Sequence, residues 1–168
     1  MYQGHPTLCG GYIIAVGYQS DCLQLENGSW NLIPNLSGKK SQMKTVVVSS
    51  PEEDNELIIG VGGWYNAYLT TVESFDGQSW NKNQFEDLPE PIYAHCLVKV
   101  NDTMLIFIGG SNSPNATVNT NVFDVLNNKW TSGPLLNIGR HFAASAVMTW
   151  QNPSTGIAEQ VIFKEKMM

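Results

Sequence analysis

Basic side chains are scarce in this chain of 168 residues. Nine lysines and arginines stand against fifteen aspartates and glutamates, and Arg140 is the single arginine. A net charge of −6 without any basic stripe offers little to attract the phosphates of a nucleic acid. We therefore expect no nucleic-acid partner.

Long apolar runs are also missing. The N-terminal stretch has no basic n-region, and its longest apolar run, Tyr12 to Val16, is too short for the core of a signal peptide. No uncharged apolar run reaches the length needed to cross a bilayer. We therefore expect no membrane partner and a cytoplasmic location.

Charged residues in general are few, at 14% of the chain, whereas 15 glycines and 8 prolines supply many turns. This mixture disfavours a bundle of long, solvated helices. Hydrophobic residues make up 42% of the chain, which is enough for a sizeable core. The composition predicts a folded domain that is rich in turns.

The cysteines number three, Cys9, Cys22 and Cys96, and none of them has C-x-x-C spacing. An odd count without paired spacing gives little support to a disulfide framework or a zinc site. Free cysteines commonly behave as small buried hydrophobic residues. We expect three reduced, structural thiols.

Four N-x-S/T sequons favour a different compartment, because they are typical of secreted glycoproteins. They begin at Asn27, Asn35, Asn101 and Asn115. With 16 asparagines and 23 serines and threonines, chance alone gives about two sequons in a chain of this length. The excess is small, and a secreted protein stays open as the alternative to a cytoplasmic one.

Catalytic and cofactor motifs are absent from the sequence. There is no G-x-S-x-G, H-E-x-x-H, Walker A or EF-hand pattern, and Gly60 to Gly63 lacks the later glycine of a dinucleotide-binding loop. His95 and His141 both precede a predicted strand and are expected to make the same structural hydrogen bond. We expect no catalytic residues, no metal site and no cofactor.

An internal repeat is the main feature that the sequence does contain. Trp30, Trp80 and Trp130 lie 50 residues apart. A large apolar residue followed by an acidic one precedes each tryptophan, as in Phe75-Asp76 and Phe123-Asp124. Further upstream lies an apolar run that ends in glycine, at 12–17, 57–63 and 104–110. The repeat predicts three copies of one structural unit.

Each unit has room for four short strands divided by turn residues, which predicts an all-β chain of antiparallel meanders. The middle copy gives strands near 43–49, 56–62, 69–76 and 79–83, and the next gives 94–100, 103–109, 118–126 and 129–131. A fourth copy has two strands, near 141–149 and 158–163, and residues 5–9 are a weak candidate for the first strand of the first copy. Such sheets cannot bury both faces alone, so the copies must pack against one another.

The order of an apolar run, a glycine pair, an aromatic-acidic pair, a tryptophan and Leu-Pro resembles the Kelch motif of Kelch-repeat β-propellers. The glycine pairs are Gly62-Gly63 and Gly109-Gly110, and the first copy departs from the pattern with Gly17-Tyr18. The resemblance implies one Kelch-repeat domain over 1–168, with four-stranded antiparallel blades at about 5–34, 43–83, 94–131 and, incomplete, 141–163.

About three and a half blades leave a propeller open. We expect the chain to be a fragment of a longer protein or to close by association, and its open blade edges to favour self-association. The repeated residues Trp30, Trp80, Trp130, Phe75 and Phe123 are expected to pack between neighbouring blades.

The loops after the glycine pairs and before each first strand are expected to form one face, where function resides in such a framework. Candidate partner-binding residues on this face are Trp64, Tyr65, Asn66, Tyr93, Asn112 and Arg140. Aromatic anchors among amide side chains suit recognition of a protein or peptide. The resemblance adds that family members place partner-binding arginines near Arg140.

We therefore predict a non-catalytic protein-protein interaction module. Kelch-like relatives joined to a BTB domain serve as substrate receptors of cullin-type ubiquitin ligases, which is a role that the resemblance makes available. Two alternatives stay open. One is an enzyme that acts on sugars, similar to galactose oxidase or to sialic-acid mutarotases, although no copper-binding set of residues can be matched here. The other is a secreted, adhesion-type Kelch glycoprotein.

Overall fold

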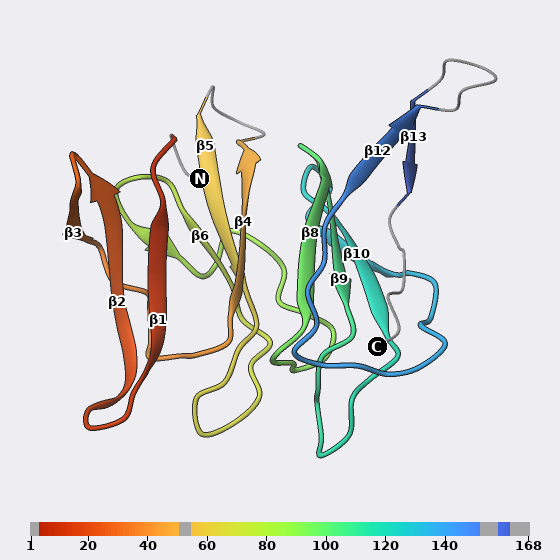
Figure 1. The fold of residues 1–168 in the computed structure, drawn as a ribbon, viewed down its shortest axis with the longest axis horizontal. Coiled ribbons are helices and arrows are strands. Elements are labelled where there is room, and N and C mark those ends of the chain that lie inside the picture. The colour runs from red at the N-terminus through yellow and green to blue at the C-terminus, as the bar shows by residue number, and fades with distance from the viewer. Residues whose placement is uncertain (1–3, 51–54, 152–157, 162–168) are drawn as a thin grey trace.

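The computed structural model describes residues 4–50, 55–151 and 158–161, and this part of the chain is all-β, as predicted. The described residues form antiparallel meanders, which Figure 1 shows as ribbons arranged side by side. Sheet 1 contains β1 (Thr7–Ile13), β2 (Gly17–Glu26) and β3 (Ser29–Ile33). Sheet 2 contains β4 (Lys44–Ser49), β5 (Glu56–Val61), β6 (Val72–Phe75) and β7 (Trp80–Asn81).

Sheet 3 repeats the meander of sheet 2, and a smaller sheet follows it. Sheet 3 contains β8 (Cys96–Asn101), β9 (Met104–Ile108), β10 (Thr120–Asp124) and β11 (Lys129–Ser132). Sheet 4 contains β12 (Met148–Gln151) and β13 (Ala158–Val161). The eight strands predicted for sheets 2 and 3 are all present. The strand predicted at 141–149 is wrong over most of its length, because residues 141–147 form no strand and β12 begins at Met148. The end of the last predicted strand, at 162–163, lies outside the described residues. No described helix is long and apolar enough to span a membrane.

The first copy differs from its prediction. The apolar run that begins at Tyr12 is not one strand, because β1 ends at Ile13 and a turn leads to β2 at Gly17. The glycine pair of this copy is Gly10-Gly11, not Gly17-Tyr18. Residues 5–9 are therefore not a first strand. Their strand residues belong to β1, which pairs with β2 as β5 pairs with β6, so sheet 1 has three strands.

The glycine pairs share one backbone geometry. Their φ angles are +64° and +115° at Gly10-Gly11, +60° and +115° at Gly62-Gly63, and +59° and +96° at Gly109-Gly110. The second glycine donates its N–H to the segment that leaves the same sheet: Gly11 to Lys40 O (2.8 Å), Gly63 to Ile92 O (2.9 Å) and Gly110 to Arg140 O (2.8 Å). A Cβ on the first glycine would lie 2.5 to 2.7 Å from that oxygen, so only glycine fits without a shift.

The main core lies between sheets 2 and 3. The largest side chains buried there, Phe107 and Phe123, come from β9 and β10. Trp130 is 9% exposed, and its indole N–H donates to the carbonyl of Glu86, which follows sheet 2 (2.9 Å). Neighbouring sheets thus pack through an aromatic ring and a hydrogen bond.

Trp80 makes the corresponding contact between sheets 1 and 2. Its indole N–H donates to Pro34 O (3.0 Å), and its ring stacks on the buried Phe75 at a centroid distance of 5.3 Å. The prediction for Trp30 is wrong, because this side chain is 51% exposed. The described residues place no sheet before sheet 1, so Trp30 has no neighbouring carbonyl or ring of that kind to cover it.

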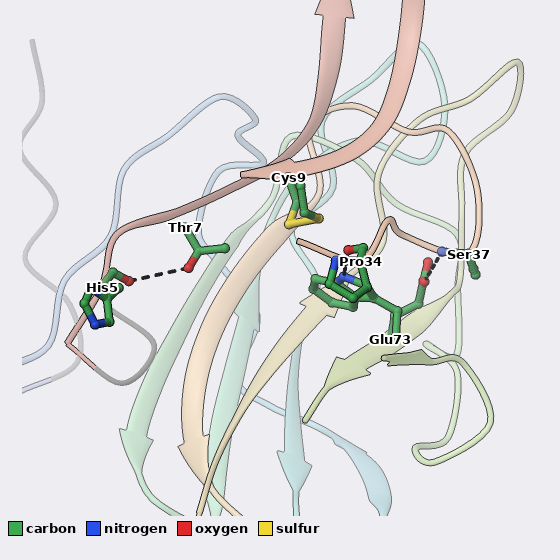
Figure 2. The surroundings of a disulfide bond; sticks show 8 residues. His5, Thr7, Cys9, Pro34, Ser37 and Glu73 are labelled. Atoms are coloured by element: carbon green, nitrogen blue, oxygen red, sulfur yellow. Dashed lines mark hydrogen bonds between the residues drawn. A yellow bond between two sulfur atoms is a disulfide. The ribbon is translucent and has the colours of Figure 1, made fainter. Parts of the chain in front are cut away.

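Cys9 and Cys22 form a disulfide bond, which corrects the expectation of three reduced thiols. The two residues are directly opposed on β1 and β2, with Cα atoms 4.1 Å apart, so the strand register brings their sulfurs together. Figure 2 shows the bond at Cys9 near Pro34 and the Ser37–Glu73 hydrogen bond. Cys96 is free and buried, as expected.

Candidate functional site

The loops expected to carry function project from one end of the sheets, the lower end in Figure 1. They include the β1–β2 turn, the β5–β6 loop and the β9–β10 loop. The segments that enter β4 and β8 also reach this end. We call this end the loop face.

A continuous series of aromatic rings crosses the loop face. Tyr12 lies 5.0 Å from Tyr18, and Tyr18 lies 5.6 Å from Tyr65, measured between ring centroids. The indole N–H of Trp64 donates to the hydroxyl of Tyr18 (2.8 Å). Because Tyr12 and Tyr18 belong to sheet 1, these contacts join the first two sheets at their loop ends.

The series continues from sheet 2 toward sheet 4. Trp64 lies 4.9 Å from Tyr68 and 5.8 Å from Tyr93, and these two tyrosines are 5.2 Å apart. Tyr93 lies 6.0 Å edge-on to Phe142, which follows sheet 3. We call these seven rings the aromatic ladder: Tyr12, Tyr18, Trp64, Tyr65, Tyr68, Tyr93 and Phe142.

Backbone pairing outside the named strands holds the ladder in place. Trp64 exchanges two hydrogen bonds with Ser41 (3.0 and 2.9 Å), and Tyr93 exchanges two with Ser111 (3.1 and 3.0 Å). Phe142 adopts a left-handed φ of +53° while its N–H donates to Ala94 O (2.9 Å). The rings therefore stand on a fixed backbone and lose little conformational freedom when they are contacted.

The ladder combines half-buried and exposed rings. Tyr18, Trp64, Tyr68 and Tyr93 are half-buried, whereas Tyr65 is 41% and Phe142 is 64% exposed. Rigid rings with exposed edges and tyrosine hydroxyl groups can pack against an apolar residue and accept or donate hydrogen bonds at the same time. This chemistry suits a macromolecular surface.

Of the predicted site residues, Trp64, Tyr65 and Tyr93 lie in the ladder. Asn66 is exposed at the tip of the β5–β6 loop with a left-handed φ of +57°. Asn112 is half-buried, and its amide donates to Glu90 (2.7 Å). Trp64, Tyr65 and Asn66 lie in the β5–β6 loop of sheet 2, and Tyr93 lies in the segment that follows this sheet. Asn112 belongs to the β9–β10 loop of sheet 3.

Glu90 organises the polar side of this region. Its second carboxylate oxygen accepts from the amide of Asn119 (2.6 Å), so both oxygens are engaged. The carboxylate borders a cavity of about 310 Å³ whose lining also includes Asn119, Asn121 and Ser132. Pro89 and Leu135 also line this cavity, so its wall is partly polar and partly apolar.

Arg140 has a backbone role that the sequence does not reveal. Its carbonyl accepts the N–H of Gly110, and the side chain is half-buried. Lys40 occupies the same position after sheet 1, and Ile92 does so after sheet 2. The side-chain chemistry of this repeat position therefore varies while its carbonyl is used in every copy.

Sequence reasoning missed Tyr12, Tyr18, Tyr68 and Phe142. Tyr12 directly follows Gly10-Gly11, as Trp64 directly follows Gly62-Gly63. Placing the first glycine pair correctly would have identified Tyr12. Tyr18 and Phe142 join the ladder through contacts between copies, which no pattern within one repeat indicates, whereas Tyr68 contacts Trp64 of its own loop.

The two histidines predicted to be equivalent are not equivalent. The left-handed residues Ala94 and Phe142 mark the same position, so His141 corresponds to Tyr93 and His95 corresponds to Ala143. The expected common hydrogen bond is absent among the described residues: both ring nitrogens of the fully buried His95 lack a partner. Burial, aided by the charge of Lys44, lowers the pKa of His95 to about 3.

Among the described residues, no three His, Cys, Asp or Glu side chains lie close enough together to hold a metal ion. Comparison with known proteins gives no match to any family model and no match to any curated protein. The geometry of the loop face is therefore the main guide to function.

Proposed function

We propose that this chain is a Kelch-type interaction module that binds a protein or peptide through the aromatic ladder on its loop face. The aromatic ladder is the observation that carries the proposal. Its rings come from three successive repeats, yet they contact one another and stay accessible at their edges. Interfaces favour such aromatic residues because they bury a large area at a small cost in side-chain entropy.

The Kelch-type assignment is supported by the repeated glycine pairs. In each copy the second glycine donates to the segment that leaves its sheet. In two copies a tryptophan donates to a carbonyl that follows the preceding sheet. Repetition of both contacts gives successive sheets the same relation to one another, which a propeller requires.

Binding can be tested with the exposed rings, whose removal leaves the core intact. Tyr65→Ala combined with Phe142→Ala removes two accessible rings of the ladder. The matched control is Met104→Ala combined with Leu126→Ala, because these exposed apolar residues lie at the start of β9 and in the β10–β11 turn. Both double variants should unfold at nearly the same urea concentration as the wild-type chain.

The partner is found by cross-linking the wild-type chain in an extract of its own source and identifying the linked peptides by mass spectrometry. Affinity for the purified partner is then measured for all three proteins. We expect the ladder variant to lose at least tenfold in affinity and the control to keep the wild-type value. Equal affinity of the ladder variant and the control would refute binding at this face.

We also propose that the chain self-associates through the uncovered side of sheet 1. Exposed apolar side chains gather in this sheet and its turn: Leu8, Tyr12, Ile13, Ile14, Val16, Trp30 and Leu32. Contiguous apolar surface of this kind marks association sites. Light scattering of the purified chain should show a mass that rises with concentration and falls in a Leu32→Asp variant. A monomer at all concentrations would contradict this proposal.

A further inference from the structure

The four sequon asparagines are accessible in the fold. Asn27, Asn35, Asn101 and Asn115 are all exposed, and none of their amide nitrogens donates a hydrogen bond within the described residues. Five asparagines outside the sequons donate from the amide nitrogen, namely Asn31, Asn112, Asn119, Asn127 and Asn128. Four others in the described part of the chain, Asn66, Asn81, Asn83 and Asn137, are exposed without such a bond but lie outside any sequon. Exposure and an amide nitrogen without a hydrogen bond therefore leave the four sequons open to attachment of a glycan.

The local backbone presents these amides at turns and loops. Asn27 has a left-handed φ of +51° at the β2–β3 turn. Asn101 begins the β8–β9 turn, where its side-chain oxygen accepts from the backbone N–H (2.9 Å) and the hydroxyl (3.1 Å) of Thr103. These bonds use the amide oxygen and leave the nitrogen without a hydrogen bond among the described residues. Asn35 follows β3, and Asn115 lies in the β9–β10 loop.

The Cys9–Cys22 disulfide is an independent observation on the same question. Cross-strand disulfides form and persist in oxidising compartments, which are also the compartments where sequons are modified. Cys22 is fully buried, so the disulfide bond is a structural part of sheet 1. The disulfide and the sequons therefore favour the same compartment for different chemical reasons.

We propose that this chain folds in the secretory pathway and carries N-linked oligosaccharides on Asn27, Asn35, Asn101 and Asn115. The co-substrate is an oligosaccharide joined to a lipid pyrophosphate. The amide nitrogen attacks the anomeric carbon of that oligosaccharide, and a C–N bond forms as the C–O bond to pyrophosphate breaks. Lipid pyrophosphate leaves with the electron pair, and one amide proton passes to a base of the transferase.

The positions of the sites are compatible with the aromatic ladder. Asn27 and Asn101 lie at the ends of the sheets opposite the loop face, the upper end in Figure 1. Asn115 lies at the loop-face end, in the loop whose Ser111 pairs with Tyr93. Three of the glycans are attached outside the ladder's own loops, and the fourth borders it.

The test uses the protein purified from its own source. It is treated with an N-glycosidase in ¹⁸O water, which converts each glycosylated asparagine into aspartate that carries the label. We expect label at all four sequons, and none in a sample kept in ¹⁸O water without the enzyme, which controls for spontaneous deamidation at Asn27-Gly28. Equal label without the enzyme, or an unlabelled sequon, overturns the assignment of the site concerned.

Alkylation in denaturant without reductant tests the compartment separately. We expect one modified cysteine, Cys96, because the other two are joined. Three alkylated cysteines in the source protein would overturn the secretory assignment. In cells that secrete the chain, Ser29→Ala should remove the glycan of Asn27, and Ser29→Thr should retain it. A glycan that persists in Ser29→Ala would contradict attachment at that sequon.

Discussion

The buried ion pair between Lys40 and Glu73 provides a strong test of how sheets 1 and 2 are joined. Lys40 lies in the segment that leaves sheet 1, and Glu73 lies on β6. The ammonium of Lys40 contacts the Glu73 carboxylate and donates to Thr71 Oγ1 (3.1 Å). The second carboxylate oxygen of Glu73 accepts the N–H of Ser37 (2.9 Å), as Figure 2 shows. Both side chains are nearly inaccessible to water.

Removing one partner leaves the other charge buried without compensation. We expect Lys40→Met or Glu73→Leu to lower the free energy of unfolding by about 3–5 kcal/mol. The double variant Lys40→Met, Glu73→Leu removes both desolvation costs, and its loss should be smaller than that of either single variant. The interaction energy between the two side chains is expected to be large because the pair is buried; exposed ion pairs contribute only about 0–1 kcal/mol.

Urea denaturation followed by circular dichroism measures these differences, with the disulfide intact in all four proteins. The slope of the free energy with urea should be unchanged, so that the midpoint alone reports stability. Losses below about 1 kcal/mol in both single variants would place the pair in solvent and refute its position between the sheets. Additive losses in the double variant would refute the contact itself.

Three further predictions concern the core and the glycine pairs, and urea denaturation measures each. Trp130→Ala should lower the free energy of unfolding by about 3–5 kcal/mol. Trp30→Ala should lower it by about 1 kcal/mol or less, because half of Trp30 is already exposed. Equal losses in the two variants would contradict the packing of the sheets. Gly110→Ala should destabilise the chain by more than Gly28→Ala. A Cβ at Gly110 would lie 2.8 Å from the His95 Cβ, whereas no atom lies within 4 Å of a Cβ at Gly28. A larger loss of stability in Gly28→Ala would contradict the close approach at Gly110. The pKa of His95 is about 3 in the folded chain and 6.5 for a solvated histidine, so the unfolded chain binds more protons between these values. Stability should therefore fall as the pH drops below 6.5, by about 2 kcal/mol near pH 5, and His95→Leu should remove that part of the loss. An unchanged pH profile in His95→Leu would show that the histidine is not buried in its neutral form.

Sheets 2 and 3 could be predicted because β4, β5 and β9 contain short apolar runs, while turn residues and the tryptophan repeat place the other strands. Sheet 1 was misread because the apolar run at 12–17 begins in β1 and continues through the β1–β2 turn. That run splits at the β1–β2 turn, and the correct glycine pair lies before it. With the turn misplaced, no reading of the sequence could bring Cys9 opposite Cys22.

Other features depend on what lies against a residue, which spacing alone does not encode. Trp30 and Trp130 occupy the same place in the repeat, yet only Trp130 has a preceding sheet to pack on. The segments between sheets also differ in length, so the shared order of tryptophan, histidine and predicted strand made His95 and His141 look equivalent when their backbone positions differ. The aromatic ladder consists of contacts between repeats and becomes visible only in three dimensions.

Hydrogen exchange at the tryptophan indole groups tests most directly whether neighbouring sheets pack through these rings. The measurement compares Trp30, Trp80 and Trp130 in the folded chain by nitrogen-edited NMR. We expect slow exchange at Trp130 and Trp80, whose indole N–H groups donate to Glu86 O and Pro34 O, and fast exchange at Trp30. Fast exchange at all three rings would contradict the packing of the sheets.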